Sequence, residues 1–464
     1  MTELHANDRP RLIILDNSIV GLGGHFLDYA LAVLTASRSR GYSPALVAHR
    51  TFRDVVPRDV WVERLYRFDN WPLAARAPVV RWLRLNLLRK RDGSPTRSRR
   101  GAPVRPSLLG TLREHYGRLD LAVRSREFER GTTTAFERLR PQLRDIIFLP
   151  NPWIPELQGL AVALKRYKAS AVSVHLVLRR EFGESESAAL AGGLRRLAGG
   201  AADNQVHFYT DTPELTRLYT ETFGLEFRTL PIPHPIMGAR GKAGSGAIQV
   251  CYSGDARSEK GFAALPELVS RVLKEFGTEQ TIRFIVQANA PSTGMERDAR
   301  EALASLRTLD TSLVTLITES QERSAYEETI LNSDVVLLPY KAEHYRYRSS
   351  GVLIEAMSAG VPALVPEQTW LANELRRFRQ AGHPSVPVTD GLPGASYSSE
   401  ADAGEKFVYM LRHLQEFQAV ARECAAQVRT QHNAENVINA LTESARSAMS
   451  AAEEAMLRNA GHGR

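Results

Sequence analysis

Cysteine is scarce in this chain, which has Cys251 and Cys424 as its only thiols in 464 residues. Two cysteines so far apart make no disulfide framework and lack the spacing of a metal site, so we expect two buried thiols of a reducing cytoplasm. Long hydrophobic runs are also missing, because charged residues interrupt each one before the roughly 20 residues that span a bilayer. Residues 1–10 show no basic segment followed by an apolar one, so no secretory signal is expected. The sequence predicts a cytoplasmic protein without a transmembrane helix.

Positive charge is concentrated in one region. The net charge is +8 at pH 7, and residues 51–150 hold 22 basic side chains against 11 acidic ones. From Arg81 to Arg105 there are nine basic residues and a single acid, Asp92. An Arg-rich insertion of this kind, at about residues 75–110, is expected to contact anionic lipid at the inner membrane face or an anionic acceptor; the alternative is a solvated loop without a specific partner. No zinc-finger, helix-turn-helix or RNP pattern accompanies the charge, so nucleic acid is not an expected partner.

The order of apolar strands and helical segments predicts an α/β protein with two doubly wound domains. Residues 11–16 form an apolar strand that leads into the turn Gly21-Leu-Gly-Gly24 and then a helix, and this alternation continues to residue 209. It begins again after a linker at residues 237–247. We therefore predict one Rossmann-like domain at residues 1–236, which binds the acceptor, and a second at residues 248–432, which binds the nucleotide sugar. A helix within residues 433–464 is expected to pack back on the first domain.

The most informative segment runs from Tyr347 to Pro366 and reads Y-R-S-S-G-V-L-I-E-A-M-S-A-G-V-P-A-L-V-P. Its Ser-Ser-Gly start leaves backbone N–H groups unpaired at the beginning of a helix, where the helix dipole adds positive charge. A diphosphate is favoured at such a point. Glu355 lies about one turn further on, where it is placed to accept hydrogen bonds from a ribose diol. The alternative is a helix acid that satisfies only the dipole.

A second candidate segment is Gly254-Asp-Ala-Arg-Ser-Glu-Lys-Gly261, which follows an apolar strand. It places Arg257 and Lys260 at the carboxyl edge of a parallel sheet, where ligands of such folds bind. Two cations at this edge can hold a diphosphate through charge-assisted hydrogen bonds. The alternative is a solvated charged turn.

Together these motifs resemble the retaining glycosyltransferases of family 4, whose GT-B fold has two Rossmann-like domains facing a central cleft. The likeness extends over nearly the whole chain. It includes the glycine turn, the strand predicted at residues 171–175, which ends in His175, the runs from Tyr209 and Leu230, and both segments described above. It implies catalytic roles at the donor diphosphate and sugar for Arg257, Lys260 and His175. It also implies a donor site of Tyr347, Ser349, Ser350, Gly351, Val352 and Glu355, and an acceptor or phosphate loop of Gly23, Gly24 and His25.

The two histidine assignments have ordinary alternatives, and two other positions depart from the family pattern. His175 is otherwise a satisfied core histidine, and His25 an ordinary residue at a helix start. Tyr347 stands where many members of the family carry a glutamate that contacts the sugar, so hydroxyl recognition must be achieved differently. Asp255 stands where the family commonly has an arginine, and Arg257 is the candidate replacement.

The resemblance implies retaining transfer of a sugar from a UDP- or GDP-linked donor to a glycan or lipid-linked acceptor. The basic surface and the absence of a secretory signal fit cell-surface polysaccharide assembly, which we expect as the role. No two aspartates are separated by a single residue, so the Asp-x-Asp metal motif of the other large glycosyltransferase fold is absent, and we expect no required metal and no cofactor. The glycine turn lacks the third glycine of a dinucleotide fingerprint, which disfavours a dehydrogenase. A non-catalytic nucleotide- or glycan-binding protein and a nucleotide-sugar epimerase remain as alternatives.

Overall fold

The computed structural model describes residues 9–21, 25–69, 108–167, 172–200, 205–233, 236–238, 246–277, 280–291 and 294–461. Side chains are not described for His25, Gly200, residues 108–116 and residues 448–461. The predicted loop residues Gly23 and Gly24 lie outside these ranges, as does nearly all of the Arg-rich insertion.

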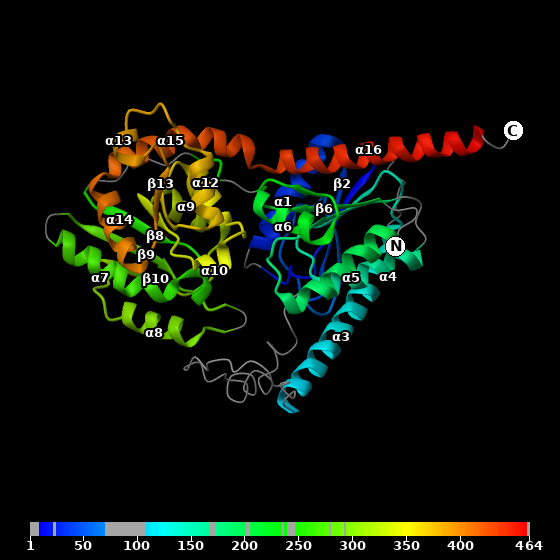
Figure 1. The fold of residues 1–464 in the computed structure, drawn as a ribbon, viewed down its shortest axis with the longest axis horizontal. Coiled ribbons are helices and arrows are strands. Elements are labelled where there is room, and N and C mark those ends of the chain that lie inside the picture. Colours follow the sequence, from blue (N-terminus) through cyan, green and yellow to red (C-terminus); the bar gives the residue numbers. More distant parts are fainter. Residues whose placement is uncertain are drawn as a thin grey trace, which may run out of the picture. The chain divides into compact units, whose positions relative to one another are not determined.

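Figure 1 shows the fold as a ribbon coloured along the sequence. The first sheet has seven strands in the order β3-β2-β1-β4-β5-β6-β7. The strands are β1 (Arg11–Leu15), β2 (Ser43–His49), β3 (Trp61–Tyr66), β4 (Ile146–Leu149), β5 (Ser173–Val177), β6 (Gln205–Thr210) and β7 (Phe227–Thr229). The helices between them are α1 (His25–Ser37), α3 (Leu108–Leu139), α4 (Ile154–Tyr167), α5 (Glu184–Gly200) and α6 (Pro213–Phe223). Central strands β1, β2 and β4 pair in parallel and are almost fully buried, as continuous apolar runs in a doubly wound sheet should be.

The second sheet has six parallel strands in the order β10-β9-β8-β11-β12-β13. They are β8 (Ile248–Tyr252), β9 (Ile282–Gln287), β10 (Val314–Ile317), β11 (Val335–Leu337), β12 (Ala363–Pro366) and β13 (Gly394–Tyr397). The helices are α7 (Leu265–Phe276), α8 (Arg297–Leu306), α9 (Arg323–Leu331), α10 (Ala342–Tyr345), α11 (Gly351–Ala359), α12 (Trp370–Arg377), α13 (Val386–Thr389), α14 (Glu400–Arg412), α15 (Leu414–Gln431) and α16 (Ala434–Gly461). The strand order reverses between β8 and β11, and the loops that follow these two strands are where such sheets bind ligands.

Alternate residues of the second sheet enter two separate cores. Val250 and Tyr252 of β8 pack with residues of α7, α8 and α14. Cys251, between them, packs with residues of α9, α11, α12 and α15. This alternation follows from the two-residue side-chain period of a strand. It places α9 and α11 on the same face of the sheet, where their side chains meet.

The fold class is as predicted: an α/β protein with two doubly wound parallel sheets. By internal contacts the chain divides into one unit of Met1–Gly21, Ser43–Leu176 and Gly183–Val206, and another of Leu22–Tyr42, Val177–Phe182 and His207–Arg464. Within the second unit α16 contacts α1, and Ser444 Oγ of α16 accepts a hydrogen bond of 2.8 Å from the Tyr209 hydroxyl. No described helix has the length and apolar character needed to cross a bilayer.

Candidate functional site

Helix α11 begins where the sequence predicts it, directly after Ser349-Ser350. Ser350 has extended backbone angles, and its hydroxyl accepts the N–H of Leu353 at 3.3 Å, which is an N-terminal cap. Among the described residues the next two amides, those of Gly351 and Val352, have no acceptor. An anion at the start of α11 can therefore accept hydrogen bonds from these two N–H groups and is also attracted by the helix dipole.

Glu355 is held by two residues of the neighbouring helix α9. Its side chain is 0% exposed, with Oε1 2.6 Å from Arg323 Nη1 and Oε2 accepting the Tyr326 hydroxyl at 2.6 Å. Burial by itself would lower the pKa of Arg323, but the charge and hydrogen bond of Glu355 outweigh it and raise that pKa. A buried carboxylate needs such partners. The ribose-binding role of Glu355 stays a prediction, and a ribose diol would join a carboxylate that already accepts two protein hydrogen bonds.

Lys260 is a buried cation in the loop that follows β8. Its side chain is 6% exposed and lies against Gly254, where a Cβ atom would come within 2.9 Å of Nζ. In the described part of the chain, Nζ has no hydrogen-bond or ion-pair partner. Burial, followed by the charge of Arg257, lowers the pKa of Lys260 to about 8. An anion that accepts hydrogen bonds from this buried ammonium group would stabilise its charged form.

Arg257 forms ion pairs with two acids of the same loop. Its Nη1 is 2.8 Å from Oε1 of Glu259, and its Nε is 3.5 Å from Oδ2 of Asp255. The other carboxylate oxygen of Glu259 lies 3.4 Å from Arg348 Nη1. Arg348 belongs to the segment before α11, so Glu259 joins the cation loop after β8 to the loop after β11.

Backbone contacts bring the same two loops together. The carbonyl of Glu259 accepts the N–H of Lys341 at 3.0 Å. Gly261 has φ +68°, and a Cβ there would lie 1.6 Å from the carbonyl oxygen of Pro339, so only glycine fits. Because β8 and β11 are adjacent parallel strands at the reversal point of the sheet, the loops that follow them leave the same edge of the sheet side by side.

The segment before α11 is also tied to residues of the same unit that precede the second sheet. The Tyr347 N–H donates to Glu181 at 2.9 Å, and its carbonyl accepts the Thr212 hydroxyl at 2.7 Å. Ser349 Oγ donates to Oδ2 of Asp211 at 2.5 Å, and the same oxygen accepts from Arg179 Nε at 2.8 Å. These contacts fix the backbone at Tyr347 and the hydroxyl orientation of Ser349.

Two predicted site residues are less informative. His175 lies in the middle of β5 rather than at the end of a strand, because β5 runs on to Val177. It is 0% exposed, with Nε2 2.8 Å from Ser173 Oγ. His25 is the first residue of α1, and its side chain is not described. The roles proposed for His175, His25, Gly23 and Gly24 stay predictions.

Several residues of the cluster were not identified from the sequence. Arg348 and Glu259 lie inside the two motifs, and their charges were the available signal. Arg323 and Tyr326 are three residues apart on one helix, a spacing that places them on one face, but nothing in the sequence pairs that face with Glu355. The remaining missed residues are Glu181, Asp211 and Thr212, which contact the segment before α11, and Arg179, which contacts Asp211.

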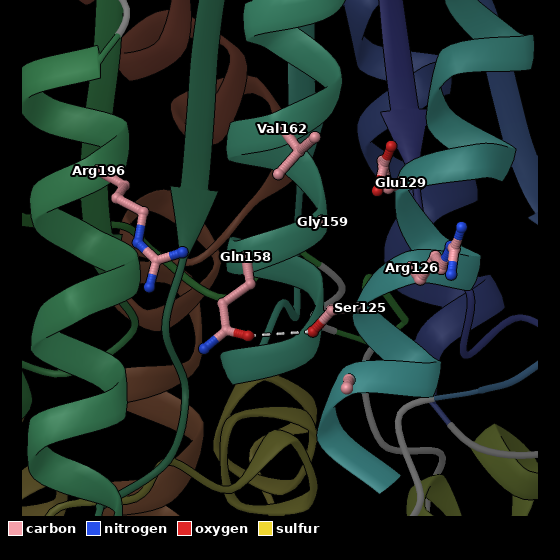
Figure 2. Close-up of a pocket in the computed structure, with 8 residues that line it drawn as sticks. Ser125, Arg126, Glu129, Gln158, Gly159, Val162 and Arg196 are labelled. Atoms are coloured by element: carbon pink, nitrogen blue, oxygen red, sulfur yellow. Dashed lines mark hydrogen bonds between the residues drawn. The ribbon is translucent and has the colours of Figure 1, made fainter. Parts of the chain in front are cut away.

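The first unit carries a separate hollow of about 260 Å³ (Figure 2). Helices α3, α4 and α5 contribute its lining, and Ser125 of α3 donates a hydrogen bond of 3.2 Å to Gln158 of α4. The two helices can approach closely because residue 159 is glycine. A Cβ atom added there would lie 2.5 Å from the carbonyl oxygen of Ser125. None of the predicted site residues lines this hollow.

Comparisons with known proteins agree with this architecture. Residues 165–443 match the family model described as "Family 4 Glycosyltransferase in conflict systems". The chain is similar to sucrose-phosphate synthase from Thermosynechococcus elongatus, with 13% identity, a TM-score of 0.61 and coverage of 96% of this chain and 100% of that one. It is similar to the UDP-forming trehalose-phosphate synthase from Burkholderia vietnamiensis, with 13% identity, a TM-score of 0.64 and the same coverage.

A third similar structure, from E. coli, is described as bound with UDP-2-fluoro glucose. It shares 15% identity, with a TM-score of 0.57 and coverage of 94% of this chain and 98% of that one. At these identities the likeness shows the fold. No curated protein sequence matches the chain significantly.

Proposed function

The chain belongs to the family 4 glycosyltransferases, in the branch described from conflict systems, and on this premise we propose that it moves a sugar from a nucleoside-diphosphate sugar to a glycan or glycolipid acceptor with retention of configuration. In this proposal the acceptor belongs to cell-surface polysaccharide assembly. The protein acts in the cytoplasm and contacts the inner membrane face peripherally through the segment from Arg81 to Arg105. That segment lies outside the described residues. UDP is the first nucleoside diphosphate to test, since one structure of the same fold is described with a UDP-sugar analogue.

The observation that carries the proposal is that the loop of Arg257 and Lys260 contacts Arg348, of the segment before α11, through Glu259 at the reversal point of the second sheet. A diphosphate placed there has two side-chain cations, the unpaired amides of Gly351 and Val352, and the positive end of a helix. Each charge-assisted hydrogen bond in such a partly buried site contributes about 1.5–3 kcal/mol. This set of groups fits a leaving diphosphate.

Leaving-group stabilisation is the main catalytic contribution of the chain. As the bond between the sugar and the diphosphate breaks, negative charge grows on the phosphate oxygen, and the preorganised charge of Lys260 and Arg257 lowers the barrier. The departing phosphate oxygen then takes the acceptor proton on the same face of the sugar, a role that follows from the retaining family. Metal-independent transfer is part of the proposal. The described residues gather no group of three or more His, Cys, Asp or Glu side chains suited to a metal ion.

The proposal is tested by incubating the protein with UDP- and GDP-sugars and candidate glycan acceptors, with and without EDTA. We expect release of UDP or GDP together with a glycosylated product whose anomeric configuration, measured by NMR, equals that of the donor. Binding of nucleotide without any product, over a broad acceptor screen, would favour the non-catalytic alternative. A changed sugar released without acceptor would favour an epimerase.

Donor affinity should depend on pH through Lys260. Its pKa of about 8 in the free protein reflects burial and the charges of Arg257 and Arg348, partly offset by Asp255 and Glu259. A bound diphosphate raises this pKa, so the complex keeps a proton that the free protein loses above pH 8. Affinity for UDP or GDP is then full below about pH 8 and falls by up to about tenfold per pH unit above it.

Isothermal titration calorimetry between about pH 6.5 and 9.5 measures this dependence. The variant Lys260→Met, which carries no titratable amine, should bind more weakly at low pH and show no further loss above pH 8. An affinity of the unmodified protein that stays constant up to pH 9.5 would contradict the assignment of Lys260 to the diphosphate.

A further inference from the structure

We infer that Arg348 is a third diphosphate-binding cation and that Glu259 is an internal counter-ion, which the diphosphate of the donor displaces from Arg257 and Arg348. The inference rests on the proposed function. It adds Arg348 and Glu259 to the groups that determine how tightly the site binds a diphosphate.

The geometry of Glu259 carries the inference. One carboxylate oxygen is 2.8 Å from Arg257 Nη1 and the other is 3.4 Å from Arg348 Nη1, so a single acid bridges cations from two loops. Burial alone would raise the pKa of Glu259, but Arg348 and Arg257 outweigh it and lower that pKa, so the acid stays charged at neutral pH. An anion already occupies these two cations when no donor is bound.

The reason for an internal anion is the density of positive charge. Lys260, Arg257 and Arg348 lie close enough for each arginine to lower the pKa of the lysine. Without an acid between them, the arginines would repel each other and the loops that carry them. Arg348 is also oriented by Tyr345, with its guanidinium carbon 4.9 Å from the ring centroid. It is therefore held in position beside Glu259 rather than extended into solvent.

A diphosphate can replace Glu259 because it offers more charge and more acceptor oxygens. The Glu259 side chain is 26% exposed, so it can leave the two arginines and be hydrated. Its backbone stays fixed, since its carbonyl accepts the N–H of Lys341. Donor binding is thus an exchange of one anion for another. The attraction between Glu259 and the arginines subtracts from the measured affinity, and removing that attraction should make binding tighter.

The experiment measures the affinity of UDP, GDP and inorganic pyrophosphate for the unmodified protein and for Glu259→Gln by isothermal titration calorimetry. We expect Glu259→Gln to bind the preferred nucleoside diphosphate and pyrophosphate about tenfold more tightly. The corresponding nucleoside monophosphate should gain less, since it has one phosphate fewer for the released arginines. Arg348→Met should bind the diphosphates about tenfold more weakly.

Two matched variants separate charge from disturbance of the fold. Glu259→Asp keeps the charge, and its affinity should stay near that of the unmodified protein. Glu275→Gln removes an acid of the same unit that pairs with Arg412 at 2.5 Å, and it should change nothing. If the unmodified protein binds UDP or GDP while Glu259→Gln binds equally or more weakly, the inference is overturned and the proposed function stands. If the unmodified protein binds no nucleoside diphosphate and no pyrophosphate, both are overturned.

Discussion

Lys260→Ala should lower kcat by about two or more orders of magnitude. The lysine is the buried cation of the loop after β8, and the described part of the chain offers its Nζ no acceptor. In the proposed reaction Nζ meets the charge that develops on the leaving diphosphate. A preorganised donor aimed at such charge typically contributes about 100- to 1,000-fold to turnover. Because Nζ also contacts the diphosphate before reaction, KM for the donor should rise, but by less than kcat falls.

Two further variants test the chemical basis of this loss. Lys260→Met keeps most of the side-chain volume against Gly254 and removes only the charge, so its kcat should be as low as that of Lys260→Ala. Lys274→Met removes an exposed lysine of α7 in the same unit and should leave kcat within about twofold. Steady-state assays with saturating acceptor give all four values. A kcat in Lys260→Met close to that of the unmodified protein would remove the lysine from the mechanism.

Glu355→Gln should weaken the binding of UDP or GDP by about 10- to 100-fold without weakening pyrophosphate. The proposed partner of Glu355 is the ribose diol, and a carboxylate that accepts two hydroxyl hydrogen bonds contributes about 1.5–3 kcal/mol. The same variant should lower the free energy of unfolding by about 2–3 kcal/mol, since it removes the buried carboxylate charge that Arg323 and the hydroxyl of Tyr326 contact, although Arg323 keeps its ion pair with Glu327. Calorimetry and urea denaturation measure the two effects separately.

A deoxy nucleotide tests whether the ribose is the group recognised. The unmodified protein should bind 2′-deoxy-UDP or 2′-deoxy-GDP more weakly than the ribonucleotide, and Glu355→Gln should bind the two forms alike. Glu327→Gln is the control, because Glu327 also pairs with Arg323, at 2.6 Å, but lies near the surface. It should leave the affinity within about twofold. Equal ribo and deoxy affinities in the unmodified protein would remove Glu355 from ribose binding.

The elements missed by the sequence reasoning were those without a clear period. Strand β3 reads W-V-E-R-L-Y, lies at the edge of its sheet and is mostly half-exposed or exposed, so it lacks the buried apolar run of a central strand. Helix α3 has four arginines and two glycines within its central part and no sharp apolar face. The prediction of β5 ended two residues too early, which placed His175 at a strand end instead of inside the sheet.

The donor motifs were recognisable because their chemistry is local. A strand followed by glycine and cations, and a serine cap followed by a buried helix, are written within about ten residues, and parallel alternation brings both to one edge of a sheet. The partners of these motifs were not recognisable. The contact of Asp211 with Ser349 joins residues 138 positions apart, and the contact of Arg323 with Glu355 joins residues 32 positions apart.

The amino-acid sequence by itself determined the two parallel sheets, the helix that starts at Gly351 and the loop that carries Arg257 and Lys260. Strand periodicity, glycine conformation and helix capping act over a few residues, so these features can be inferred without coordinates. Only the tertiary structure decided that Glu259 bridges Arg257 and Arg348, and that Glu355 is buried against α9. Such pairings depend on which faces of packed helices and which loop ends meet, and that is a property of the folded chain as a whole.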